Sequence, residues 1–263
     1  MLIDFHTHVF PDKLAPHAME SLSQKAGLQP LTDGTLSFTE RLMRAQGADD
    51  FVALNIAATP HSEKKVNDFA IATNAAHPAF GSVHPLSENA LAELGCLAAA
   101  GVKGVKFHHE YQNFFADDER AFPLYEKIEE LGLVAVFHGG ADPGFAPPWK
   151  ATPERCARVI AAFPRMKLVV AHLGGLLMAD DALTFLKNTP VYIDTAYMAG
   201  AYEPQTAERV IKEFGAERVL FGSDCPWDTP EHTFRFLQKL HLSGEETDLI
   251  AYKNACRLLG RAE

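Results

Sequence analysis

The chain has 263 residues, of which 47% are hydrophobic and 22% charged, and its 24 lysines and arginines against 34 aspartates and glutamates give a net charge of −10. This composition is typical of a globular protein with a sizeable core, and an acidic chain without a basic stretch argues against nucleic acid as a partner. No apolar run approaches the length of about 18 residues that crosses a bilayer, and the four cysteines have no CxxC spacing. We therefore expect a cytoplasmic protein with reduced thiols.

Short apolar runs alternate with stretches of helical periodicity along the chain. The periodic stretches carry helix signals: Thr152 followed by Pro153 is typical of a helix start, and Gly132 of a helix end. The apolar runs predict eight strands, at Leu2–Phe5, Phe51–Ala57, Ala79–Val83, Gly104–Phe107, Leu133–Phe137, Leu168–Ala171, Val191–Asp194 and Val219–Phe221.

A strand followed by a helix, repeated along the chain, indicates a parallel sheet. Eight such units close most simply into a (β/α)8 TIM barrel, because an open sheet would leave two exposed edges. We therefore expect a single α/β domain over residues 1–263. It should have an elaborated loop at Gly27–Ser37 and an extra C-terminal helix at Ser243–Leu259.

Histidines gather where the predicted strands end. In barrels of this type the chemistry lies at the carboxyl ends of the strands, so this distribution predicts a functional site at that end. Eight of the twelve histidines lie at or just beyond a strand end: His6, His8, His61, His84, His108, His109, His138 and His172.

The pair His6 and His8 has a geometric explanation. Strand side chains alternate, so residues two apart share a face, and both imidazoles are expected to point into the barrel mouth. With His138 from the fifth strand and Asp224 from the eighth, three nitrogens and one carboxylate can converge on one cation. This donor set suits zinc, with manganese as the alternative, and leaves a position open for water. Asp194, at the end of the seventh strand, is expected to support these ligands or to be structural.

Other residues near the mouth have two interpretations each. Lys106 and His108 share a face and are candidates for a second metal or for substrate binding, although Lys106 could equally be a structural residue. His84 is a candidate substrate contact. Phe145 and Trp149, in the segment after the fifth strand, are further candidates, for which a packing role is equally compatible.

Five motifs resemble those of a known family. In chain order they are DFHTH, GVKGVKFHHEYQ, VFHGG, AHLGG and RVLFGSDCPW. Together they are similar to the amidohydrolase superfamily, and most similar to its amidohydrolase-2 branch, which includes decarboxylases, a hydratase and lactonases. The resemblance extends from Met1 to about Pro230 and implies the same barrel fold.

The resemblance also implies roles for the residues at the strand ends. The four donors named above match the family's metal ligands. Asp224 matches a residue that binds the metal or takes a proton from its water, and His172 matches one that activates water or substrate. Lys106 lies where members with two metals carry a carboxylated lysine that bridges them. The resemblance therefore implies one divalent metal, or two if Lys106 is carboxylated.

Hydrolysis is the first function that this site suggests. Metal-activated water would attack a small amide, lactone or similar carbonyl compound that bears a carboxylate, and Asp224 or His172 would move the proton. The alternative is a metal-dependent non-oxidative decarboxylase or hydratase of a small carboxylic acid, and the second alternative is a lactonase that needs no metal. The expected partner is a small-molecule substrate, without nucleic acid or membrane, and a homo-oligomer stays open.

Overall fold

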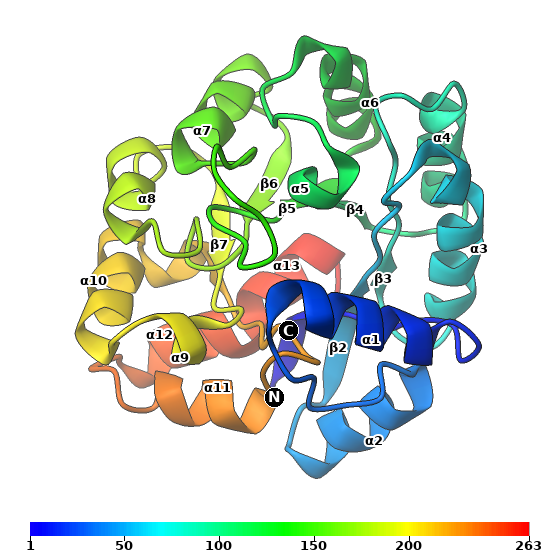
Figure 1. Cartoon of the computed structure of the whole chain (residues 1–263). Coiled ribbons are helices and arrows are strands. Elements are labelled where there is room, and N and C mark those ends of the chain that lie inside the picture. The colour runs from blue at the N-terminus through cyan, green and yellow to red at the C-terminus, as the bar shows by residue number, and fades with distance from the viewer. Residues whose placement is uncertain (263) are drawn as a thin grey trace.

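The computed structural model describes residues 1–262, and its parallel strands form a barrel surrounded by helices (Figure 1). The carboxyl ends of the strands lie on one side, where the loops that carry the histidines begin. The strands are β1 (Ile3–Thr7), β2 (Asp50–Leu54), β3 (Ala79–Phe80), β4 (Gly104–Phe107), β5 (Val134–Phe137), β6 (Lys167–Val170), β7 (Tyr192–Asp194) and β8 (Val219–Leu220).

Two hydrogen-bonded sheets make up this barrel, and single contacts join them. Strands β1, β2 and β3 form one sheet and β4 to β8 the other, with every pair parallel. Between β3 and β4, Gly81 donates its N–H to the carbonyl of Gly104 and accepts one from Lys106. Between β8 and β1, the N–H of Phe5 donates to the carbonyl of Phe221. These contacts close the ring, and the (β/α)8 barrel expected from the sequence is confirmed.

Two strands, β2 and β3, end three residues earlier than their apolar runs predict. The runs that begin β2 and β3 continue to Ala57 and Val83, both fully buried, but the ladder ends before them. Their carbonyls are bonded instead to the side-chain amide of Gln112, at 3.0 and 2.9 Å. Apolar patterning indicates burial, and here the buried segments extend beyond the strands. They can do so because the side chain of Gln112 replaces the neighbouring strand as hydrogen-bond donor.

The helices begin and end at the signals found in the sequence. The Thr152 side chain accepts a hydrogen bond from the N–H of Arg155, Pro153 opens the helix that follows, and Gly132 ends another with a left-handed φ of 66°. The helices are α1 (Ala15–Ala26), α2 (Leu36–Ala45), α3 (Glu63–Thr73), α4 (Ala90–Ala99), α5 (His109–Gln112), α6 (Phe122–Leu131), α7 (Pro153–Ala162), α8 (Ala179–Phe185), α9 (Met198–Ala201), α10 (Pro204–Phe214), α11 (Pro230–Leu237), α12 (Gly244–Asp248) and α13 (Asn254–Leu259).

The C-terminal segment forms the extra helix that the sequence predicts. A capping box between Ser243 and Glu246 starts α12, and the helical path continues through a π-turn into α13. Side chains of α13 join the apolar cluster that contains Phe5 and other strand residues. Arg261 then pairs with Asp50, the first residue of β2, at 2.5 Å. The segment therefore packs against the amino-terminal end of the barrel, away from the histidines at the carboxyl ends of the strands.

The loop expected at Gly27–Ser37 is shorter than predicted, because α2 begins at Leu36. The connection between β1 and β2 also contains α1, which lies across one side of the barrel mouth in Figure 1. None of the helices in residues 1–262 is long and apolar enough to cross a membrane.

Candidate active site

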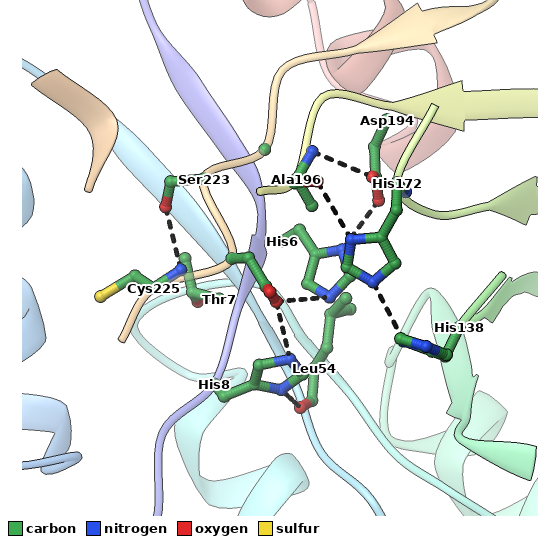
Figure 2. A network of polar contacts seen from close by, with 12 residues as sticks. His6, Thr7, His8, Leu54, His138, His172, Asp194, Ala196, Ser223 and Cys225 are labelled. Atoms are coloured by element: carbon green, nitrogen blue, oxygen red, sulfur yellow. Dashed lines mark hydrogen bonds and ion pairs between the residues drawn. The ribbon is translucent and has the colours of Figure 1, made fainter. Parts of the chain in front are cut away.

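His6 and His8 direct one nitrogen each to the same carboxylate (Figure 2). Their Nδ1 atoms are held from behind: His6 by Asp194 Oδ2 at 2.8 Å, and His8 by the carbonyl of Leu54 at 2.9 Å. Their Nε2 atoms both lie 3.3 Å from Asp224 Oδ1. A hydrogen bond at Nδ1 fixes the tautomer and leaves the Nε2 lone pair free for a cation. The structure therefore brings His6 and His8 to one carboxylate oxygen, whereas His138, the fourth predicted ligand, lies in a separate group with His108 and Asp142.

His138 and His172 form a second pair of imidazoles beside the first. His172 Nε2 lies 3.0 Å from His138 Nδ1. The opposite nitrogens face carbonyls: His172 Nδ1 that of Ala196 at 3.0 Å, and His138 Nε2 that of Ala141 at 3.1 Å. If both donate to these carbonyls, the two nitrogens between the rings each present a lone pair, and the contact needs a proton or a cation. The contact is satisfied when one of the two rings carries a second proton.

Burial favours the neutral form of His6 and His138. The pKa of His6 is lowered well below its ordinary value by burial and then by the nearby Lys106. Burial also lowers the pKa of His138 well below its ordinary value, with His108 and His172 adding to the effect. Neutral imidazoles are the form that binds a metal ion. The residues present therefore fit a divalent cation held by nitrogen and carboxylate donors.

The backbone at two of these residues is strained. His172 and Asp224 have left-handed φ values of 62° and 71°, a conformation that non-glycine residues adopt at an energetic cost. The N–H of His172 donates to Asp194 Oδ1 at 2.8 Å, and the N–H of Asp224 donates to the carbonyl of His6 at 2.9 Å. These bonds hold the two strand ends in place. Such strain is concentrated at functional sites.

The glycines that follow His138 serve a contact between two loops. A Cβ at Gly140 would lie 2.3 Å from the backbone nitrogen of Leu176, and its φ is 81°. Here the loop after β5 pairs with the loop after β6. The glycines therefore allow a close approach between two backbones, which sets the loops that carry His138 and His172 side by side.

Lys106 is fully buried under the site. Its Nζ lies 3.3 Å from His6 Nε2. Burial lowers the pKa of Lys106 to about 8, although the carboxylates of Asp194 and Asp224 oppose the change. The structure thus places Lys106 beside a metal-ligand candidate, and its role as a metal bridge stays a prediction.

Asp142 is a residue that the sequence analysis missed. Its Oδ1 accepts the N–H of Gly144 at 2.7 Å, and its Oδ2 lies 3.2 Å from His108 Nε2 and 4.0 Å from His138 Nε2. The rings of His108 and His138 are stacked, with centroids 4.2 Å apart. The signal was present, since an aspartate before Pro-Gly favours a turn that holds the carboxylate. His108, His138 and Asp142 form a second group with metal-ligand geometry, beside the group of His6, His172 and Asp224.

A cavity of 360 Å³ opens above these residues. Its floor consists of the strand-end residues, and α1 and neighbouring loops supply the opposite wall. Of the predicted substrate contacts, His84, Phe145 and Trp149 are not among the lining residues, and their role stays a prediction. The floor residues are His8, His108, His138, Asp142, His172 and Asp224.

The chain is similar to known proteins in sequence and in fold. A stretch of 113 residues is 25% identical to gamma-resorcylate decarboxylase from Polaromonas sp. (strain JS666 / ATCC BAA-500), over 36% of this chain and 35% of that protein. The match thus spans about a third of the curated relative. Among solved structures, an uncharacterized TIM-barrel protein from Bordetella bronchiseptica superposes with a TM-score of 0.78 and 19% identity, over 98% of both chains.

A second solved structure, dihydroxybenzoic acid decarboxylase from Polaromonas sp. JS666, has a TM-score of 0.74 and 18% identity, over 99% of this chain and 98% of that one. At this identity the likeness shows the shared barrel. The family model described as Amidohydrolase matches residues 3–261. The strand-end histidines, the barrel and this match over almost the whole sequence agree, and the chain belongs to the amidohydrolase family.

Proposed function

We propose that this chain is a metal-dependent, non-oxidative decarboxylase of a small aromatic hydroxy-acid. The observation that carries the proposal is the convergence of His6, His8 and Asp224 on one point at the floor of a cavity. The relatives support the type of reaction, since gamma-resorcylate decarboxylase and dihydroxybenzoic acid decarboxylase are among them. This support favours decarboxylation over the hydrolysis that the sequence first suggests.

The cofactor that we propose is one divalent cation, zinc or manganese. His6, His8, His138 and Asp224 would hold it, and nitrogen-rich donor sets of this kind suit zinc. The dihydroxybenzoic acid decarboxylase from Polaromonas contains manganese. When bound, the cation neutralises the substrate carboxylate and polarises a neighbouring oxygen.

The reaction breaks the bond between the ring carbon and the carboxylate carbon. The electron pair stays on the ring carbon, carbon dioxide leaves, and the ring carbon takes up one proton. We assign this proton to His172, which lines the cavity and has its Nδ1 fixed by the Ala196 carbonyl at 3.0 Å. Because Nδ1 keeps its own proton, the proton given to the ring carbon is the second one, which Nε2 carries when the ring is doubly protonated and which water then replaces.

The test is a turnover assay with metal-loaded protein on 2,6-dihydroxybenzoate, alongside a panel of small lactones and amides. We expect carbon dioxide release that stops when the metal is removed. Asp224→Asn should lose both metal and activity. His172→Gln should keep the metal and lose about 100-fold in kcat, the usual contribution of a positioned proton donor. Hydrolysis of a panel compound without carbon dioxide release from the acid would contradict the proposal, and so would turnover that survives complete metal removal.

A further inference from the structure

The cavity has two chemically different sides. Its polar side is the floor of histidines and aspartates described above. The opposite side is mainly apolar. Helix α1 provides much of it, with apolar side chains at helical spacing beside the polar His17 and Ser21. These apolar residues of α1 are Ala18, Met19, Leu22 and Ala26, with Leu28 just beyond the helix.

Helix α1 is fixed in this position by contacts at both of its ends. Near its start, Met19 is buried against Gly34, where a Cβ would lie only 2.9 Å from the Met19 side chain. Near its end, Lys25 Nζ lies 3.7 Å from the ring centroid of Phe145 and 4.7 Å from that of Tyr111. Cation–π contacts at these distances are attractive. The apolar wall is therefore a fixed part of the cavity.

Charge is distributed unevenly around the cavity. Among the residues that line it within the described chain, none is a lysine or an arginine, and Asp142 and Asp224 are both acidic. An anionic group against the α1 wall would lose its hydration without gaining a positive partner, which is costly. A bound cation at the floor would attract one carboxylate, and only on that side.

We infer that α1 forms an apolar subsite that takes the uncharged, hydrocarbon part of a monocarboxylate while the carboxylate lies at the histidine floor. The inference deepens the proposed function and rests on it for the orientation of the carboxylate. The subsite favours an alkyl-substituted aromatic acid and rejects an acid with a second carboxylate at the far end of the ring. Leu22, half-buried and on the cavity face of α1, is the specificity-determining residue.

The size of the cavity agrees with this assignment. Its 360 Å³ would hold roughly a dozen water molecules at about 30 Å³ each, and pockets for small organic ligands begin at about this volume. Each methylene group moved from water to an apolar wall contributes about 0.8 kcal/mol, or about 4-fold in affinity. A two-carbon substituent against α1 should therefore improve binding by about 15-fold.

The experiment measures binding of three benzoates to zinc-loaded protein by titration calorimetry, so that no turnover is needed. We expect 4-ethylbenzoate to bind about 15-fold more tightly than benzoate, and terephthalate at least about tenfold more weakly. Leu22→Arg should reverse the order of 4-ethylbenzoate and terephthalate. Leu22→Ala, a milder change if the arginine disturbs folding, should remove most of the ethyl preference. Gln24→Arg adds the same charge to α1 outside the cavity and should leave the order unchanged.

The outcomes test the apolar subsite and the decarboxylase proposal separately. Terephthalate binding as tightly as benzoate to the unmodified protein would overturn the subsite, as would a binding order that Leu22→Arg and Leu22→Ala leave unchanged. Failure of 4-ethylbenzoate to bind would overturn it too. If the predicted binding order holds while the turnover assay finds hydrolysis only, the subsite stands and the decarboxylase proposal fails.

Discussion

Asp194→Asn should disable a metal ligand without disturbing the fold. In the structure, Asp194 Oδ1 accepts the N–H groups of His172 and Ala196 at 2.8 and 3.1 Å, while Oδ2 faces His6 Nδ1 at 2.8 Å. An asparagine can keep the first two bonds only if its oxygen takes the place of Oδ1. Its NH2 group then faces His6, whose Nδ1 must become the acceptor. The proton moves to Nε2, the atom that points to the metal site.

The size of the effect follows from this tautomer change. Loss of the partner behind a metal-binding histidine usually costs 10- to 100-fold in metal affinity, which is about 1.4–2.8 kcal/mol. The metal-free protein should keep its thermal stability to within about 1 kcal/mol, because the side chain keeps its volume and its two backbone bonds. The opposite amide orientation would place an NH2 group against two N–H donors, so the asparagine cannot restore the original tautomer of His6 by turning its amide.

Chelator competition on purified protein would measure the affinity for zinc. Asp50→Asn is the matched control, since Asp50 also holds a histidine Nδ1, that of His77, at 2.8 Å, but at the opposite end of the barrel. It should leave zinc affinity unchanged. If Asp194→Asn binds zinc within twofold of the unmodified protein while it stays folded, the tautomer argument is wrong.

Three further predictions concern stability and the position of α1. Both ring nitrogens of buried His109 lack a partner, so His109→Leu should raise the free energy of unfolding by about 1 kcal/mol in urea titrations; a loss would refute this. Burial raises the pKa of Asp117, but the hydrogen bonds from Arg158 and Arg155 together outweigh it, and the pKa lies below its ordinary value of 3.8. The ionised carboxylate therefore stabilises the fold above that pH, and the cost of Asp117→Asn, about 0.5–1 kcal/mol at pH 7, should disappear as the pH falls below about 3; a cost independent of pH would contradict the pairing. Lys25→Met removes the cation from the Phe145 ring and should speed hydrogen exchange in residues 15–26 about fivefold. Unaltered exchange would show that this contact does not hold α1 in place.

The barrel could be predicted because its signals are local. Each buried strand is a short apolar run, and several helices have a start or end signal such as Thr152 or Gly132. Strand ends were harder to predict, because the carbonyls of Ala57 and Val83 bond to the side chain of Gln112, a residue distant in the sequence. Periodicity cannot reveal such a partner.

The site could be predicted only in part, for a similar reason. The sequence predicts that His6, His8 and Asp224 lie close together. The two histidines are two residues apart, so they share a face of the strand, and Asp224 follows a strand end. The contact between His138 and His172 and the place of Asp142 beside His108 depend on how loops fold over the mouth. The lining by α1 likewise depends on packing between segments far apart along the chain.

The most direct test of the account is the fate of a labelled carboxylate. Metal-loaded protein would be mixed in D2O with 2,6-dihydroxybenzoate that carries ¹³C in its carboxyl group, and followed by NMR. The account predicts that the label appears as carbon dioxide and bicarbonate, that the ring carbon gains one deuterium per turnover, and that chelation stops both. A label that stays on the ring under conditions where the protein turns over an ester, a lactone or an amide would contradict it.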